Sequence, residues 1–210
     1  MKIFSIEGGL YNFLDKFSNF FLLNLLWLIM CIPIITIFPA TIAMFGVVRK
    51  WIKGEHVKLF NCFFTLFKEN FIQSLLIGVI AFIFTLLLIL NFNITSLMDN
   101  PFKVITLSLL SLIGFLSLCT SVYIFPVIVN YNVKWTAVIR NSFLLSVSQP
   151  FVTLPSILIL LISMVIVYTV PITLFIVGSL SAYLIYFLCN KTFQKVEAQF
   201  NQFKKEGQSA

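Results

Sequence analysis

The side chains that could carry acid–base chemistry lie outside the apolar segments of this chain. A general acid or base needs an ionisable group in a protected place, and coupled membrane carriers keep such a group near the midplane. His56 is the only histidine, and it stands among Lys53, Glu55 and Lys58, where we expect a solvated side chain. The seven carboxylates also fall in polar stretches: Glu7, Asp15, Glu55, Glu69, Asp99, Glu197 and Glu206. The sequence therefore predicts no site for proton-coupled chemistry.

Nucleophile and metal-ligand patterns are equally sparse. The four cysteines, Cys31, Cys62, Cys119 and Cys189, fall in different segments without a C-x-x-C pair, which predicts neither a metal site nor a disulfide framework. The sequence also has no G-x-S-x-G motif, no H-E-x-x-H motif and no glycine loop for a phosphate. We therefore expect no catalytic residue, no cofactor site and no metal site, in a protein that is not an enzyme.

The elements that must position any site are membrane helices. An uncharged stretch of 32 residues runs from Phe17 to Val48, 60% of all residues are hydrophobic, and the mean hydropathy is +1.05. A bilayer core of about 30 Å takes roughly 20 apolar residues in a helix, and an unsatisfied backbone group there costs several kcal/mol. We predict an all-α, polytopic integral membrane helix bundle in one domain, residues 1–195, and a polar cytoplasmic tail, residues 196–210. Full spans are expected near 17–37, 71–92, 104–129, 143–166 and 171–190, with a short returning limb at 39–53.

The first uncharged stretch allows two topologies, because Pro33 and Pro39 bracket six residues that look like a turn. A single crossing gives five spans, with eleven Lys and Arg inside and three outside. A return at the prolines changes this division to thirteen and one. Residues 39–53 measure only about 22 Å as a helix, so we expect a re-entrant or tilted limb whose Arg49, Lys50 and Lys53 reach the headgroups.

The formal net charge of +7 is explained by membrane topology. The basic residues stand between apolar segments and near the C-terminus, whereas a nucleic-acid surface would gather them in one stripe. We therefore expect no nucleic-acid partner. The predicted location is the bacterial plasma membrane, with a cytoplasmic C-terminus and, in the returning topology, a cytoplasmic N-terminus.

Two connectors on the predicted cytoplasmic side are alike at a shift of 71 residues. The segments FNCFFTLFKEN, residues 60–70, and YNVKWTAVIRN, residues 131–141, each precede a pair of predicted spans. This indicates a parallel internal repeat, and chance similarity is an equal alternative. Phe60, Phe63, Phe64 and Phe67 have helical spacing, which predicts an interfacial cytoplasmic helix.

Small residues predict faces where helices pack within the bundle. One face, in the span 104–129, consists of Ser108, Ser111, Gly114, Ser117 and Ser121. Another, in the last span, pairs Gly178 with Ala182 four residues later. Small side chains let helix backbones approach closely, so we expect both faces to meet other helices.

A set of short motifs begins at Asn24. The first three motifs are N-L-L-W (Asn24 to Trp27), C-x-P (Cys31 and Pro33) and P-A-T (Pro39, Ala40 and Thr41). Next comes R-K-W-I-K-G-E, which begins with Arg49 and Lys50 and ends with Gly54 and Glu55. Further along the chain are F-K (Phe67 and Lys68) and the residues Arg140, Asn141 and Phe143. The set resembles the YesL family of bacterial multi-pass membrane proteins, which are grouped under a domain of unknown function. One departure is Phe38, where the family pattern predicts a glycine.

The resemblance implies a non-enzymatic function. Family members are multi-pass proteins, mainly of Gram-positive bacteria, often encoded near carbohydrate ABC-transporter genes. The resemblance therefore implies an accessory or regulatory partner of carbohydrate ABC-transport systems, whose partners would be the lipid bilayer and either permease subunits or further copies of itself. The motif residues are then candidate interaction positions, and no catalytic residue carries over. The alternative is a small solute channel or carrier that acts as an oligomer.

Overall fold

The computed structural model describes the backbone of residues 4–98, 102–131 and 133–206, and the side chains of residues 14–98, 102–131 and 133–198. The elements are α1 (Phe4–Met30), η1 (Ile34–Thr36), α2 (Ile37–Ile52), α3 (Leu59–Ser96), α4 (Lys103–Asn130), α5 (Trp135–Ser148), α6 (Pro150–Thr169), η2 (Pro171–Thr173) and α7 (Leu174–Glu206). Every element in the described part of the chain is helical. The predicted fold class, an all-α membrane helix bundle, is thus confirmed.

Five segments of the described chain are long and apolar enough to cross a membrane. They are Ile34–Ile52, Leu59–Ser96, Lys103–Asn130, Pro150–Thr169 and Pro171–Ala198. The first of these includes η1 as well as α2, so the returning limb has 19 residues where 15 were expected. A helical segment of this length is close to the roughly 20 residues that a membrane crossing needs, so length no longer argues against a crossing by this limb.

The chain turns back at the two prolines. α1 ends at Met30, η1 follows Pro33, and the hydroxyl of Thr36 donates to the carbonyls of Met30 at 2.6 Å and Pro33 at 2.5 Å. Pro39 then occupies the first turn of α2, where a backbone N–H has no helical partner to lose. α1 and α2 form a hairpin, which is the shape that the returning topology requires.

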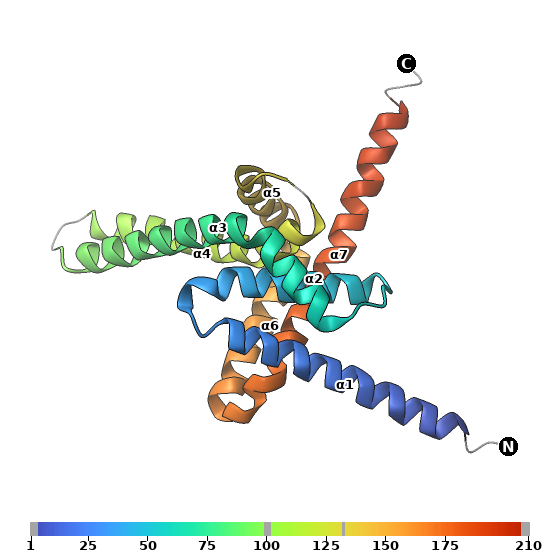
Figure 1. Ribbon diagram of the computed structural model, residues 1–210. Helices are drawn as coiled ribbons and strands as arrows, with labels where there is room; N and C mark the ends of the chain where they lie inside the picture. The colour runs from blue at the N-terminus through green and yellow to red at the C-terminus, as the bar shows by residue number, and fades with distance from the viewer. Residues whose placement is uncertain (1–3, 99–101, 132, 207–210) are drawn as a thin grey trace.

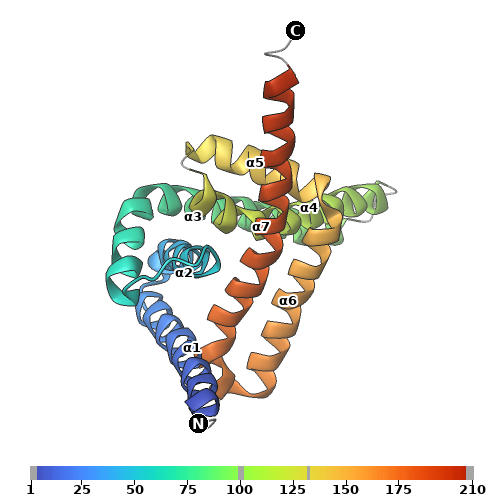
Figure 2. The same cartoon turned by 90° about the vertical axis from the view of Figure 1, so that its right-hand side faces the viewer.

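α2 is the centre of the bundle. Figure 2 looks along it and shows α1, α3 and α7 around it, and α4 also contacts it. Nine of its 16 residues are buried, in an unbroken run except at Thr41: Pro39, Ala40, Ile42, Ala43, Met44, Phe45, Gly46, Val47 and Val48. A helix that is apolar all round belongs in an interior, so its composition explains its position.

The beginning of α3 packs against α2 and does not form a separate interfacial helix. Phe63 and Phe67 are buried, whereas Phe60 and Phe64 are exposed, so only one face of the predicted stripe covers α2. Gly46 lets the helices approach closely, since a Cβ there would lie 2.6 Å from a methyl carbon of Leu66. α3 bends around α2 and then continues without a break (Figures 1 and 2), so the expected start at residue 71 is not a helix boundary.

The second half of the chain departs from the expected limits at two places. α7 continues to Glu206, past the expected end of the last span at residue 190 and into the expected tail. The other departure lies between α5 and α6. Gln149, with φ −127° and ψ 63°, separates α5 from α6, and Pro150 is the first residue of α6. Residues 143–148 therefore belong to α5, and the expected span 143–166 corresponds to a helix over 150–169. Proline at a first helical position explains this boundary.

The helix boundaries recur at the shift found in the sequence. Leu97 and Phe102 lie between α3 and α4. The residues 71 positions later are Tyr168 and Thr173, and they bracket the turn between α6 and α7. Each half therefore contains a hairpin of long helices, as an internal repeat predicts. In Figure 1 the α3–α4 hairpin projects to the left and the α6–α7 turn points downward, so the two hairpins diverge.

Candidate functional site

Asn24 fastens α1 to α7. Its side chain is fully buried, and its Nδ2 donates to the carbonyl of Leu174. Its Oδ1 has no hydrogen-bond partner among the described residues. A Cβ at Gly178 would collide with this Oδ1, and Ala182 one turn later is also buried. Gly178 and Ala182 therefore form a packing face, as predicted, and that face receives α1.

Trp27 and Thr41 join α1 to α2. The indole Nε1 of Trp27 donates to Oγ1 of Thr41 at 3.1 Å, and that hydroxyl donates to the carbonyl of Ile37 at 2.7 Å. A buried indole N–H needs such an acceptor. Two motifs that are 14 residues apart in the sequence thus meet across the hairpin.

The R-K-W-I-K-G-E motif ends α2. Gly54 has a φ of +77°, a conformation that favours glycine, and its N–H donates to the carbonyl of Trp51 at 3.0 Å. The N–H of Glu55 donates to the carbonyl of Lys50, also at 3.0 Å. This pair of bonds is a Schellman motif, which satisfies carbonyls that the helix end would leave unpaired.

Arg49 lies beside polar side chains of two other helices, and the three residues together are called the Arg49 cluster: Arg49 of α2, Asn130 of α4 and Tyr186 of α7. The guanidinium of Arg49 lies beside the phenol of Tyr186, which donates to Oδ1 of Asn130 at 3.4 Å. Arg49 is half-buried, and its Nε is inaccessible. The returning helix therefore carries this atom into the bundle.

Tyr123 of α4 and Thr192 of α7 carry two buried hydroxyls with no hydrogen-bond partner among the described residues. Tyr123 is 0% exposed and Thr192 is 1% exposed. The phenol of Tyr123 lies near Thr192 and also near Thr153 of α6, whose hydroxyl already donates to the carbonyls of Ser146 and Gln149. Cys189, which lies between Tyr186 and Thr192 on α7, is also fully buried.

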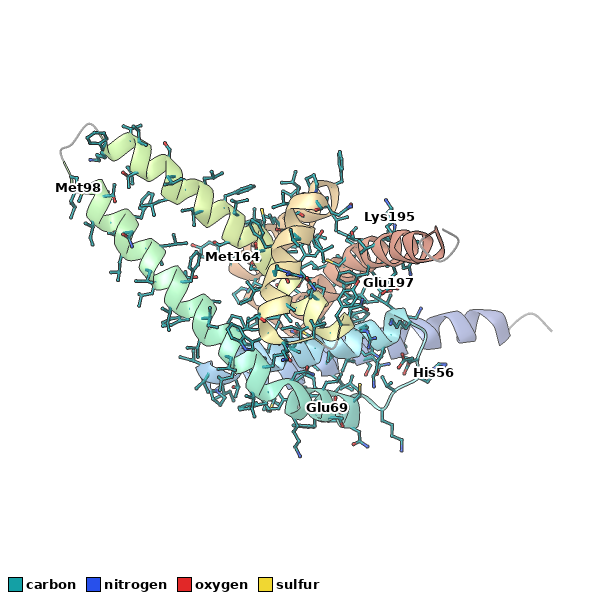
Figure 3. The ribbon with its side chains drawn as sticks, turned by 90° about the horizontal axis from the view of Figure 1, so that it is seen from above. His56, Glu69, Met98, Met164, Lys195 and Glu197 are labelled. Carbon is teal, nitrogen blue, oxygen red and sulfur yellow. The ribbon has the colours of Figure 1, made fainter. Side chains whose placement is uncertain are left out.

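Tyr131 borders the cluster just beyond the end of α4. Its ring packs edge-on against Phe193 at 5.4 Å, and burial, with the nearby Glu197 carboxylate, raises the pKa of its phenol. Figure 3 shows Glu197 on α7 beyond this point. Tyr131 therefore keeps its proton at neutral pH and remains a hydrogen-bond donor.

The other motif residues do not join the cluster as a set. Pro33 lies in the exposed turn, Ala40 and Phe67 are buried apolar residues, Lys68 and Arg140 are exposed, and Asn141 is half-buried on α5. The ring of Phe38 packs against Gly78, where a Cβ would collide with it, and lies 5.7 Å from the ring of Phe125. Tyr123, Tyr186 and Thr192 were not among the residues predicted from the sequence, because aromatic and hydroxyl residues are frequent in all the spans.

The serine-rich face of α4 is not a packing face among the described residues. Ser108, Ser111 and Ser121 are exposed, and a Cβ at Gly114 would have nothing within 4 Å. The expectation of packing within the bundle is therefore wrong here, because α3 and α4 splay apart (Figure 3). Between them lies an open hollow, the arm groove, lined by Leu88, Ile89, Phe92, Asn93, Leu110, Ser111 and Gly114.

The described residues contain no group of three His, Cys, Asp or Glu side chains that could hold a metal ion. Chemically, the molecule offers two features of different kinds. The Arg49 cluster presents hydrogen-bond donors and one positive charge, and the arm groove presents an apolar surface with small residues.

Comparison with known proteins gives the family. Residues 20–92 match a family described as "Protein of unknown function, DUF624". The chain is 35% identical to "Uncharacterized protein YesL" of Bacillus subtilis (strain 168) over 159 residues, which are 73% of this chain and 74% of that protein. It is also 27% identical to "Uncharacterized protein YesV" of the same organism over 203 residues, 94% of this chain and 98% of that protein.

A third relative, "Uncharacterized protein YteU" of Bacillus subtilis (strain 168), is 28% identical over 145 residues, which are 67% of this chain and 65% of that protein. No solved structure matches the chain. The matched region begins before Asn24 and ends after Lys68, so it includes the turn at the prolines, the C-cap of α2 and Arg49. The chain therefore belongs to the YesL-like family of proteins that share the DUF624 domain.

Proposed function

We propose that this membrane protein is non-enzymatic and acts through helix contacts with other membrane subunits in the bacterial plasma membrane. The subunits we propose are permeases of carbohydrate ABC-transport systems, to which the family resemblance points. The observation that carries the proposal is the arm groove, whose small residues have no helix against them.

A helix of a partner would fit this groove for a physical reason. Lipid tails are as apolar as leucine, so membrane helices associate through close packing and hydrogen bonds and gain little from apolar burial alone. Ser111 and Gly114 allow a close backbone approach, and Asn93 adds an amide at the rim. The surrounding side chains of the α3–α4 hairpin, such as Leu87 and Leu112, are exposed and suit either lipid or a partner.

Affinity purification of the tagged full chain from native membranes tests the proposal. We expect permease subunits to copurify in mild detergent with the unaltered chain, and to be lost with Gly114→Trp, which fills the groove. Leu112→Trp is the matched control, because it adds the same indole to an exposed position of α4 away from the groove. Equal recovery of permease with both variants, or no permease with the unaltered chain, would reject the proposal.

The Arg49 cluster favours a second candidate function, that of a solute channel or carrier acting as an oligomer. Polar and charged groups inside membrane bundles often mark the path of a substrate. Flux of small solutes into liposomes that contain only this protein, abolished by Arg49→Gln, would favour the channel or carrier over the accessory role.

A further inference from the structure

We propose that the permease helix takes, on α4, the place that α1 takes on α7 within the chain. The inference rests on the accessory role proposed above, because it specifies where along α4 the partner helix lies and in which direction that helix runs.

The first argument is the interface between α1 and α7. The hydroxyl of Ser179 donates to the carbonyl of Phe20 at 2.8 Å, and the ring of Tyr183 packs edge-on against that of Phe20 at 5.4 Å. Asn24 lies against Gly178, which comes earlier in α7. Later residues of α1 thus meet earlier residues of α7, so the two helices run antiparallel.

The second argument is the recurrence at a shift of 71 residues, which places an equivalent face on α4. On α7 the face is covered by α1 and α2, and its four residues are each at most 2% exposed: Ser179, Ala182, Ile185 and Tyr186. The counterparts on α4, which we call the bare face, are Ser108, Ser111, Gly114 and Phe115. Ser108, Ser111 and Phe115 are exposed, and a Cβ at Gly114 would meet nothing within 4 Å. The bare face shares Ser111 and Gly114 with the arm groove.

The chain therefore has two equivalent faces for a helix and one α1 to cover them. A second copy does not supply the missing helix, because Asn24 and Phe20 of its α1 lie against its own α7. The remaining side of α1 exposes Phe17, Phe21 and Ile29, and these bulky side chains would hold two helix backbones apart. A transmembrane helix of a different subunit is the occupant that remains.

The equivalence also gives the chemistry of this occupant. The hydroxyl of Ser108 donates to the carbonyl of Val104 at 2.8 Å, and its counterpart Ser179 makes a similar bond to Ile176 as well as its bond to α1. Ser108 can therefore donate to a backbone carbonyl of an antiparallel partner helix. Leu107 stands where Gly178 receives Asn24, so the partner should have a small residue opposite Leu107.

Site-specific photocrosslinking of the tagged full chain in native membranes tests the position and the direction. Benzoylphenylalanine at position 104 or 112 suits the site, because the counterparts Phe175 and Tyr183 are aromatic residues beside α1. Both positions should crosslink to one helix of the permease, and the residue reached from 112 should precede, in the permease sequence, the residue reached from 104. Position 109 is the matched control, since Leu109 and its counterpart Leu180 are both exposed, and we expect little crosslinking there.

Substitution then tests close packing. Ser108→Trp should lower the recovery of permease by about tenfold or more, because it overfills a close contact, whereas Leu109→Trp should leave recovery unchanged. Both side chains are exposed in the isolated chain, so equal thermal unfolding midpoints should show that both variants fold.

The outcomes separate this inference from the accessory role. No permease with the unaltered chain would reject both. Permease that is lost with Gly114→Trp but retained with Ser108→Trp would overturn this inference alone. Equal crosslinking from positions 104, 109 and 112, the reverse order of crosslinked residues, or crosslinks to lipid or to further copies of this chain only would do the same.

Discussion

Individual polar side chains fasten the helices of this protein to one another. Asn24 links α1 to the start of α7, and Trp27 links α1 to α2 through Thr41. In a membrane such bonds are modest in energy but directional, so they fix which faces of the helices meet. The N-L-L-W motif therefore has a structural role that its composition alone does not reveal.

The bond between Trp27 and Thr41 should be measurable by a double-mutant cycle. We expect Trp27→Phe and Thr41→Val to couple by about 0.6 kcal/mol, the typical size of an interhelical hydrogen bond in a membrane protein. The free energy of unfolding in mixed micelles, measured for the two single variants and the double variant, gives this coupling. Strict additivity would contradict the bond.

A side chain at position 178 should destabilise the protein as long as Asn24 is present. Gly178→Ala places a Cβ against Oδ1 of Asn24, and we expect the free energy of unfolding to fall by about 1–3 kcal/mol. Gly114→Ala is the matched control, since a Cβ there meets nothing within 4 Å, and we expect it to be neutral or slightly stabilising. Asn24→Ala should reduce the cost of Gly178→Ala, and an equal loss at both glycines would show that the contact is unimportant.

At the scale of the element, α2 organises the bundle. It is enclosed by α1, α3, α4 and α7, and Gly46 brings α3 close to it. Its end is fixed by the Schellman motif at Gly54, which also sets the direction of the loop that contains His56.

Replacement of Gly54 tests the cap. Gly54→Ala should cost about 1 kcal/mol of unfolding free energy, because an alanine at a φ of +77° is strained. Gly54→Asn should cost less, since asparagine adopts this conformation more readily than alanine. A thermal unfolding midpoint that is unchanged in Gly54→Ala would contradict the prediction.

At the scale of the whole molecule, the loop that follows α2 and the end of α3 lie far apart. His56 and Met98 lie at opposite ends of the molecule (Figure 3), and the loop of His56 also contains Lys53. The positive-inside rule predicts that Asp99 faces the outer side, but Asp99 lies outside the described residues. Its neighbour Met98 therefore takes its place in a test of topology.

The basic loops should face the cytoplasm because of the positive-inside rule. In a cysteine-free background, we expect an impermeant thiol reagent to label Met98→Cys in intact cells, and to label Lys53→Cys and Lys134→Cys only after the membrane is opened. All three side chains are exposed in the structure, so burial inside the protein would not prevent the reagent from reaching any of them. Labelling of position 53 or 134 from outside would overturn the orientation.

The sequence by itself determined the membrane class, the turn at Pro33 and Pro39, and the approximate course of the long helices. Length and apolar composition are local properties, and a bilayer permits few structures other than helices. Even the apolar circumference of α2, which explains its central position, is present in the printed residues. The break at Gln149 was harder to locate, because an apolar stretch with prolines can begin its helix at several residues.

Only the tertiary structure decided which polar residues meet. Arg49 comes near Tyr186, 137 positions later, because α2 returns into the bundle and α7 passes beside it. Likewise, the serines around Gly114 have the spacing of a packing face, but α3 diverges from α4 and leaves that face open. Helical spacing states which side chains share a face. The partner of that face depends on how distant helices cross, which the local pattern of residues does not encode.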